Sequence, residues 1–373
     1  MPGVLVFAAF ACLALMAGAS VLAGCGATSS SGASVSTPAS ISAASTSGAS
    51  TSTSGANPQT AAQSQPVSLK LAVEFTDHAA CAMVAEEKGW FEDEGLNITS
   101  VENYVTGTDL AAALARGDIQ AAYICLVPAI NARANGGVDI KVVAGTHKYG
   151  YALVGNPSRI SSTRDLAKPD IRLACTQAGT ACDVLLQRLC EENNLPASQI
   201  GTATQRMNPP AQVLALQAGK VDACFVPEHW ATLAEGTGCK VLALSQDIWP
   251  DMQGSVLVVK EEFIRQHPEV VEKLVRVTQR STAWIIENPG EAADILANML
   301  SVTGHTVLPD KAAESAAKLS ITPGAMKQSM SRLKYDTSVD PTQVQATIDF
   351  MNRLGYLKKN IQASDLLDLR FMQ

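Results

Sequence analysis

The sequence predicts an α/β protein made of two similar lobes, with a helical region at its carboxyl end. From residue 67 onward, segments with the alternating apolar pattern of strands take turns with segments of helical spacing, as in parallel βαβ units. A helix–glycine–strand junction occurs in each predicted lobe, and beyond Trp249 the pattern becomes almost entirely helical. The chain has 373 residues, of which 47% are hydrophobic, so it is long enough for two or three domains.

Residues 67–150 are predicted to form the first lobe. Alternating apolar positions and β-branched residues mark its strands, and helical spacing marks the segments between them. We expect strands over residues 67–75, 98–104, 119–125 and 138–145, and helices over residues 79–94 and 109–116. Strands that are separated by helices favour a parallel sheet.

Residues 151–248 are predicted to form a second lobe of the same kind. We expect strands over residues 171–176, 221–226 and 240–244, and a helix over residues 181–192. Thr180 precedes this helix and Asp183 follows three residues later, which is the spacing of a capping box.

The two lobes share a short local repeat. Leu114–Ala121 (LARGDIQA) and Leu216–Ala223 (LQAGKVDA) each end a helix with glycine and then enter a strand at once. Glycine at this position is typical of a left-handed helix cap. Such a junction also arises without duplication, but its presence in both halves supports two lobes of similar plan.

Residues 249–373 are predicted to return to the first lobe and to add the carboxyl-terminal helices. We expect a strand over residues 255–259, then helices over residues 268–288, 291–300, 311–319, 323–334 and 341–354. Several of these helices open with proline, whose missing N–H costs nothing in a first turn. No long linker precedes the tail, so it should pack on the first lobe, with the chain crossing between lobes near residues 150–157 and 246–256.

The charge distribution argues against nucleic acid as a partner. The chain has 28 basic and 35 acidic residues, a formal net charge of −7, and its first charged side chain is Lys70. Because no basic stripe is present to neutralise phosphates, we expect no nucleic-acid partner.

The first 25 residues have the features of an export signal. One apolar run extends from Val4 to Met16, and small residues lead to Leu22-Ala23-Gly24-Cys25, which resembles the bacterial lipobox. A run of this length is typical of a signal peptide. The resemblance implies that Cys25 carries a lipid and anchors the protein to a membrane. The alternative interpretation of the run is a transmembrane anchor.

Residues 26–66 are predicted to be a flexible linker. They consist largely of Ser, Thr, Ala and Gly and contain neither a charged nor an aromatic residue. Such a segment cannot bury enough apolar surface to offset the entropy cost of ordering. It would hold the folded lobes at a distance from the membrane.

Several segments of the folded region resemble the nitrate/sulfonate/taurine (aliphatic sulfonate) family of ABC-transporter substrate-binding lipoproteins. These are Glu87–Ile98 (EKGWFEDEGLNI), Thr106-Gly107-Thr108 and the two junction repeats. The resemblance covers roughly residues 67–355. It implies a type II periplasmic-binding-protein fold, in which two α/β lobes joined by a two-stranded hinge close on a small ligand. It also implies delivery to an ABC-transporter permease, with no catalytic residue and no cofactor.

The predicted ligand site lies beyond the carboxyl ends of the strands, where helix amino termini present free backbone donors. The strongest candidate is Thr106-Gly107-Thr108, since glycine lets a backbone approach an anionic group closely. Asp77, Thr108 and Thr180 are also candidate helix caps, and capping alone could explain them. The candidate ligand-binding residues are Thr76, Asp77, His78, Cys81, Thr106, Gly107, Thr108, Cys125, Gln177, Gly179, Thr180, Asn208, Glu228 and His229.

The cysteines allow two interpretations. Of nine, Cys12 would leave with the signal and Cys25 would take the lipid, so an odd number remains in the folded region. Cys175 and Cys182 follow the core-facing periodicity of their elements, which favours a structural role. Cys81, Cys125 and Cys182 also lie at predicted cleft-facing junctions, which favours a functional thiol cluster. Because the sequence has no CxxC or HxxxH spacing, no metal ligand is assigned.

The ligand itself stays open at this point. A small sulfonate-, taurine- or nitrate-like anion is the default for the family. No Arg or Lys lies in the predicted cleft segments, so an anion would rest on backbone donors and hydroxyls; a neutral or cationic ligand, helped by Asp77 and Glu228, is also open. One alternative is a metal- or thiol-reactive binding protein that uses Cys81, Cys125 and His78. A further alternative is an enzyme similar to the thiamine-pyrimidine synthases of this fold, whose dense Cys-rich motif is absent here.

Overall fold

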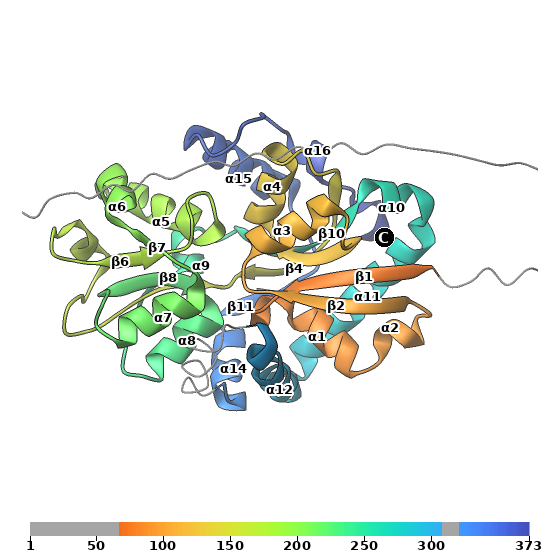
Figure 1. Cartoon of the computed structure of the whole chain (residues 1–373), viewed down its shortest axis with the longest axis horizontal. Coiled ribbons are helices and arrows are strands. Elements are labelled where there is room, and N and C mark those ends of the chain that lie inside the picture. Colours follow the sequence, from red (N-terminus) through yellow and green to blue (C-terminus); the bar gives the residue numbers. More distant parts are fainter. Residues whose placement is uncertain (1–66, 308–320, 373) are drawn as a thin grey trace, which may run out of the picture. The chain divides into compact units, whose positions relative to one another are not determined.

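A computed structural model describes residues 67–307 and 321–372 of the chain (Figure 1). The expected signal peptide, the lipid on Cys25, the linker and the helix expected over residues 311–319 lie outside the described residues. In the part that is described, no helix is both long and apolar enough to cross a membrane.

The first of two sheets has six strands in the order β11-β4-β10-β3-β1-β2. β1 runs parallel to β2 and β3, whereas β10 is antiparallel to both β3 and β4. The strands are β1 (Ser68–Glu74), β2 (Asn97–Tyr104), β3 (Ala121–Cys125), β4 (Ile140–Tyr149), β10 (Gln253–Lys260) and β11 (Leu333–Tyr335). All strands expected from the sequence in these regions are confirmed. β11 is a correction, because the helix expected over residues 323–334 ends at Met330 and the chain then pairs with β4.

Helices cover both faces of this sheet: α3 and α4 lie on one side, and α1, α2 and the later helix α12 (Pro289–Val307) on the other (Figure 1). The helices that follow its first strands are η1 (Asp77–Ala79), α1 (Ala80–Glu87), α2 (Trp90–Asp93), α3 (Gly107–Arg116) and α4 (Leu126–Ala134). The single helix expected over residues 79–94 is wrong, because Gly89 adopts a left-handed conformation (φ 70°) and separates α1 from α2. α4 was not predicted, since nearly all of it is buried and it shows no amphipathic pattern.

The second sheet has five strands in the order β7-β6-β8-β5-β9. Its parallel strands β6, β7 and β8 are joined by β5, which is antiparallel to β8 and β9. The strands are β5 (Tyr151–Gly155), β6 (Leu173–Cys175), β7 (Gln205–Arg206), β8 (Ala223–Pro227) and β9 (Lys240–Leu244). The helices are η2 (Thr163–Ala167), α5 (Ala181–Glu192), α6 (Ala197–Ala203), α7 (Pro209–Gln217), α8 (Glu228–Glu235) and α9 (Ser245–Ile248). Each sheet thus combines parallel strands with an antiparallel strand that directly follows a passage of the chain from the other sheet, β5 in the second sheet and β10 in the first.

The chain passes between the sheets twice, and histidine rings pack against both passages. Tyr149 (φ 70°) and Gly150 (φ 92°) join β4 to β5, and the return leads from α9 to β10. A Cβ atom on Gly150 would lie 2.6 Å from His78 Nε2, and one on Gly254 would lie 2.4 Å from His147 Cε1. Side chains are therefore excluded at both glycines, because the rings occupy the space.

The carboxyl-terminal region contacts helices of both sheets. It contains α10 (Glu261–Gln266), α11 (Pro268–Glu287), α12 (Pro289–Val307), α14 (Pro323–Met330), α15 (Pro341–Arg353), α16 (Ala363–Leu366) and η3 (Leu369–Met372). Arg332, after α14, pairs with Glu228 and Glu235 of α8 at 2.7 Å each. Arg353 of α15 pairs with Glu191 of α5 at 2.8 Å. The tail packs on the first sheet, as expected, through β10 and β11, which pair with β3 and β4, and these ion pairs add contacts to helices of the second sheet.

The cysteines of the folded region are unpaired thiols. Cys81, Cys125, Cys175, Cys182, Cys190 and Cys224 are buried, and Cys239 is half-buried. Cys175 and Cys182 belong to the apolar cluster that also contains α3, α4 and α5. Their expected core-facing positions are confirmed.

Candidate functional site

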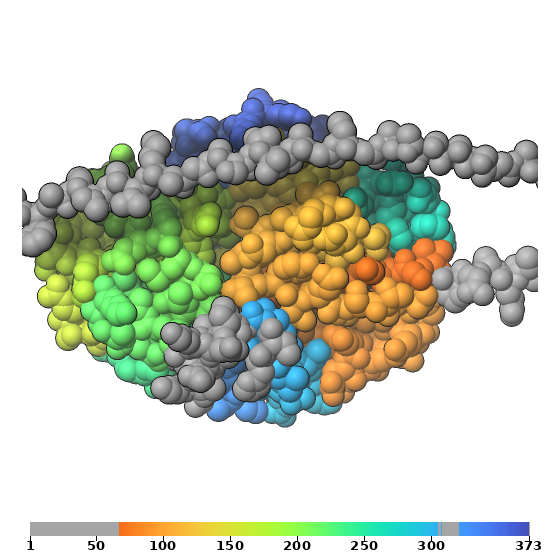
Figure 2. All heavy atoms as spheres, viewed as in Figure 1, coloured from red at the N-terminus to blue at the C-terminus, as the bar shows by residue number. Residues whose placement is uncertain are grey.

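A cavity of about 320 Å³ lies where strands of both sheets end. Figure 2 shows the two parts of the chain that flank it, residues near 100–130 in orange and residues near 180–230 in green, meeting at the surface. Its lining comprises Glu74, Val105, Thr106, Gly107, Thr108, Asp109, Cys125, Pro128, Tyr151, Thr176, Gln177, Thr180, Ala181, Cys182, Arg206, Met207, Asn208, Pro209 and Pro227.

The amino ends of three helices reach this cavity. Thr106 caps α3 by accepting from the backbone N–H of Asp109 at 3.2 Å, and Asn208 caps α7 by accepting from Ala211 at 3.0 Å. No side chain caps α5. Because a helix amino terminus carries partial positive charge and free N–H groups, the uncapped end of α5 offers donors to an anionic ligand.

The capping box expected at α5 is wrong. The hydroxyl of Thr180 donates to the carbonyl of Gln177 at 2.7 Å, so it turns away from its own helix. The carboxylate of Asp183 accepts from Gly179 N at 3.0 Å, from Arg206 at 2.6 Å and from the Tyr356 hydroxyl at 2.6 Å. Asp183 therefore fixes the loop before α5 rather than its first turn.

Two other expected caps are also wrong. Thr76, not Asp77, precedes the first helical turn after β1, and its hydroxyl accepts from His78 N at 3.4 Å. Thr108 lies inside the first turn of α3, because Thr106 is the cap. Thr108 is exposed and faces the cavity, so its hydroxyl is available to a ligand.

Glu74 brings a buried carboxyl group to the cavity wall. Its Oε1 accepts from Cys125 N at 2.9 Å, and its Oε2 lies 3.0 Å from Cys125 Sγ, which donates to it. Burial raises the pKa of Glu74, although the two hydrogen bonds from Cys125 oppose this effect. Gly107 packs against the carboxyl group, since a Cβ atom there would lie 2.3 Å from Glu74 Oε1. An anionic ligand group was expected to come close to the backbone at Gly107. In the structure, the carboxyl group of Glu74 occupies that place.

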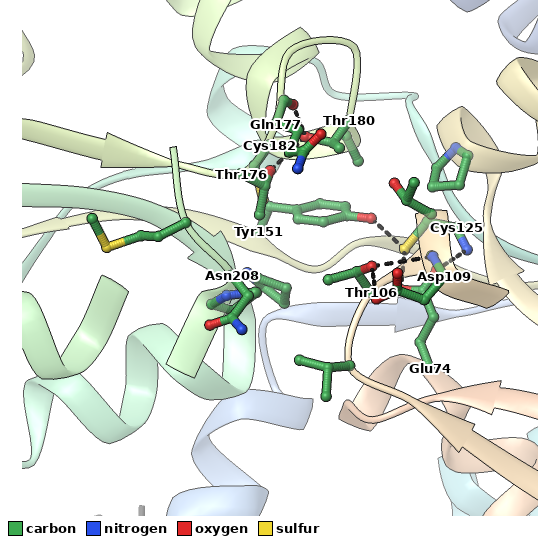
Figure 3. A pocket seen from close by; sticks show the side chains of 18 of the residues that line it. Glu74, Thr106, Asp109, Cys125, Tyr151, Thr176, Gln177, Thr180, Cys182 and Asn208 are labelled. Carbon is green, nitrogen blue, oxygen red and sulfur yellow. Dashed lines mark hydrogen bonds between the residues drawn. The ribbon is translucent and has the colours of Figure 1, made fainter. Parts of the chain in front are cut away.

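Cys125 is surrounded by polar atoms from four elements. Tyr151 donates its hydroxyl proton to Sγ at 2.7 Å, Ser255 Oγ lies at 3.4 Å, and His78 Nδ1 lies at 3.6 Å. Figure 3 shows Tyr151 reaching across the cavity toward Cys125. Burial, together with the charge of Glu74, raises the pKa of Cys125 well above its ordinary value. Burial lowers the pKa of His78 to about 4, against the opposing effect of Asp77, so the thiol and the ring are both neutral at pH 7.

Arg206 places a cation in the cavity wall. No Arg or Lys was predicted there. Arg206 donates to the carbonyl of Thr176 at 2.8 Å and to Asp183 at 2.6 Å. It belongs to the two-residue strand β7, which is too short to show a periodicity. Glu74 was also missed, although an acidic residue at the carboxyl end of an apolar strand was a usable signal.

The structure brings only some of the predicted residues to the cavity. Thr106, Gly107, Thr108, Cys125, Gln177, Thr180 and Asn208 line it. Gly179 lines a second pocket beside it, together with Thr180 and Tyr356. Thr76, Asp77, His78, Cys81, Glu228 and His229 do not line the cavity and are all buried.

Most of these buried residues form a polar cluster behind the cavity. Asp77 accepts from Thr76 Oγ1 at 3.0 Å and from Ser329 Oγ at 2.5 Å, and His229 Nδ1 lies 3.5 Å from its Oδ1. Burial by itself would raise the pKa of Asp77, but the hydrogen bond and charge of His229, with the charge of His78, hold it below its usual range. The cluster joins the segment after β1 to α8 and α14.

Glu228 and Cys81 contact other parts of the protein and not the cavity. Glu228 pairs with Arg332 at 2.7 Å; burial raises its pKa to about 7, although Arg332 opposes the rise. Burial raises the pKa of Cys81 to about 12. Cys81 belongs to the apolar cluster of α1 and α11, so the structure favours the core interpretation for this thiol.

Comparison with known proteins supports the resemblance seen in the sequence. A protein from Bacillus subtilis (strain 168) named for binding aliphatic sulfonates is 25% identical over 299 residues, which cover 78% of this chain and 83% of the relative. The taurine-binding periplasmic protein of Escherichia coli (strain K12) is 27% identical over 235 residues, covering 61% of this chain and 70% of the relative.

Comparison with solved structures finds binding proteins of the same kind. The solved structure of the alkanesulfonate-binding protein from Xanthomonas axonopodis pv. citri, bound to MOPS, superposes with a TM-score of 0.67 at 19% identity, covering 82% of this chain and 99% of the other. The predicted periplasmic-binding-protein fold is therefore confirmed. The NMT1-like family profile matches residues 62–301, and the chain belongs to the NMT1-like family.

Proposed function

We propose that this protein is the extracytoplasmic solute-binding component of an ABC-type importer, which holds a small ligand in the cavity between its sheets and delivers it to a permease. The observation that carries the proposal is the cavity itself, which receives the amino ends of α3, α5 and α7. The relatives are binding proteins rather than enzymes, which supports a role without chemistry on the ligand.

The two walls of the cavity favour a sulfonate-like anion, and above all one that also carries an amine. Thr176, Gln177 and Thr180 lie near the uncapped end of α5 on one wall (Figure 3). Arg206 belongs to the same wall. On the facing wall, Glu74 and Asp109 supply carboxyl groups. An anionic group would accept hydrogen bonds from the first wall, and an amine would donate to the second.

Titration calorimetry with taurine, short alkanesulfonates, nitrate and uncharged amides of the same size tests this proposal. We expect at least one sulfonate to bind with a 1:1 stoichiometry and the amides not to bind. Thr108→Val, which removes an exposed hydroxyl from the cavity wall, should weaken that binding roughly tenfold, the value of about one hydrogen bond to a charged group.

Thr99→Val is the matched control. Thr99 is an exposed threonine of β2 that does not line the cavity, so this change should leave the affinity unaltered. Absence of binding by every sulfonate and by nitrate would contradict the ligand class. Equal losses in the two variants would contradict the assignment of the cavity as the ligand site.

Attachment to the membrane through a lipid on Cys25 is part of the same proposal. It is supported by the Leu22-Ala23-Gly24-Cys25 segment. When the full chain is expressed in bacteria fed a radiolabelled fatty acid, we expect label in the protein. Cys25→Ser should abolish the label, whereas Cys12→Ser, a change in the apolar run of the signal, should retain it. Label that persists in Cys25→Ser would exclude this attachment site.

A further inference from the structure

We propose that Glu74, His78 and Cys125 form a binding site for one thiophilic divalent metal ion, of the zinc and cobalt class, at the inner end of the cavity. One oxygen, one nitrogen and one sulfur atom of these side chains all lie within 4.8 Å of one another. The three residues are 7%, 1% and 3% exposed. The site goes beyond the proposed transport function in its ligand, a metal ion, and it shares Glu74 with the wall of the solute cavity.

The two distances that join Cys125 Sγ to the other donor atoms are close to those of tetrahedral coordination. Zinc takes sulfur at about 2.3 Å and nitrogen or oxygen at about 2.0–2.2 Å, which sets neighbouring ligand atoms roughly 3.3–3.6 Å apart. Cys125 Sγ lies 3.6 Å from His78 Nδ1 and 3.0 Å from Glu74 Oε2. The shorter contact is the hydrogen bond from the thiol, and it would open by a few tenths of an ångström when the thiol proton leaves for solvent.

The histidine ring is held in the orientation that a metal ligand needs. His78 Nε2 lies 2.6 Å from the carbonyl oxygen of Gly150. A carbonyl oxygen only accepts hydrogen bonds, so Nε2 carries the proton, and Nδ1 of the neutral ring presents its lone pair to Cys125. A backbone carbonyl that fixes the second nitrogen in this way is the usual support of a metal-binding histidine. Only glycine fits at residue 150 beside the ring, because a Cβ atom there would lie 2.6 Å from Nε2.

The donor set and its position decide which ion fits and how it enters. A thiolate with an imidazole and one carboxylate favours zinc or cobalt over calcium and magnesium, which prefer oxygen ligands alone. Glu74 and Cys125 line the cavity (Figure 3), so an ion reaches them from that side. A fourth ligand, water or an anionic group, would come from the cavity, which Tyr151 also lines.

Cobalt titration of the full chain, kept reduced with a phosphine rather than a thiol, tests this site with the metal alone. We expect one equivalent of Co²⁺ to produce a thiolate-to-cobalt charge-transfer band in the near ultraviolet and the intense visible bands of four-coordinate cobalt. Equimolar Zn²⁺ should remove both. Cys125→Ser should abolish the charge-transfer band, and Glu74→Gln should weaken cobalt binding at least about tenfold.

Cys190→Ser is the matched control, since Cys190 is a buried cysteine of α5 that does not line the cavity; it should bind cobalt as the unmodified chain does. X-ray absorption of the zinc-loaded unmodified chain gives a readout that does not depend on the folding of any variant, and we expect one sulfur and the rest nitrogen or oxygen. The proposal is overturned if cobalt at equimolar concentration produces no bands, if the bands survive Cys125→Ser, or if absorption reports no sulfur ligand or more than one.

Discussion

Gly107→Ala is expected to reduce ligand affinity by at least about tenfold and to lower the unfolding free energy by about 1–3 kcal/mol, the usual cost of overpacking a filled site. The added Cβ atom would lie 2.3 Å from Glu74 Oε1 and 2.7 Å from Pro128 Cγ. The proline ring is rigid, and the carboxyl group is held by Cys125 N at 2.9 Å. Both neighbours line the cavity, so displacing either one changes the ligand site. Calorimetric titration with the sulfonate that binds the unmodified chain measures the first effect, and urea unfolding measures the second.

Gly290→Ala is the control for this change. Gly290 also lies in the first turn of a helix, α12, but a Cβ atom there would have no neighbour within 4 Å. The change should leave affinity unaltered and should not lower stability, because alanine is the better helix former. Full affinity in Gly107→Ala would show that Glu74 and Pro128 have room to move, and would remove the argument that Gly107 shapes the cavity.

Asp77→Asn is expected to lower the unfolding free energy at pH 7 by about 1–3 kcal/mol, the range for leaving buried hydrogen-bonding groups without a charged acceptor. The substitution keeps the shape of the side chain but removes the charge that faces His229, at 3.5 Å, within a fully buried cluster. Ser329 also donates to this carboxylate from α14, at 2.5 Å. Since the cluster joins β1 to α8 and α14, its loss weakens contacts of both sheets.

The pH dependence of this effect has a definite sign. The pKa of Asp77 is held below its ordinary 3.8 in the folded protein, because His229 and His78 outweigh burial. A carboxyl group of this kind stabilises the fold above pH 3.8, and its contribution is lost as the pH falls below that value. The difference in unfolding free energy between the two proteins should therefore be full at pH 7 and smaller at pH 3. Urea unfolding at both values measures it.

Asp247→Asn is the matched control, because Asp247 is an exposed aspartate of α9. Its stability should stay within about 0.5 kcal/mol of the unmodified chain at both pH values. A difference for Asp77→Asn that is the same at pH 7 and at pH 3 would contradict the role of the ionised carboxylate. The loss would then come from packing alone.

The elements predicted best are those whose signal is local. The helix expected over residues 181–192 and the strand expected over residues 240–244 have the same bounds in the structure. Gly117 (φ 82°) and Gly219 (φ 63°) adopt the left-handed conformation expected of the repeated junction. Apolar periodicity and glycine caps depend on neighbours within a few residues, so a single sequence is enough to read them.

The errors arise where a distant residue competes with a local signal. The spacing of Thr180 and Asp183 is right for a capping box, but Arg206 and Tyr356 bind the Asp183 carboxylate instead. Gly89 breaks a helix whose apolar pattern continues through it. β7 exists only because two residues pair with β6.

The residues of the site also fall into two groups, those with a local sequence signal and those that only the tertiary structure brings together. The sequence by itself determined the α/β architecture, the family, and the cavity residues Thr106, Gly107 and Thr108, because a glycine between hydroxyls before a helix is a local pattern. Only the tertiary structure decided that Arg206 enters the cavity, that Asp77 and His229 lie behind it, and that Glu74 and His78 meet Cys125. Cys125 is 51 residues from Glu74 and 47 from His78. No local periodicity links residues so far apart, and they meet because β1 and β3 are adjacent parallel strands that end at the same edge of the sheet.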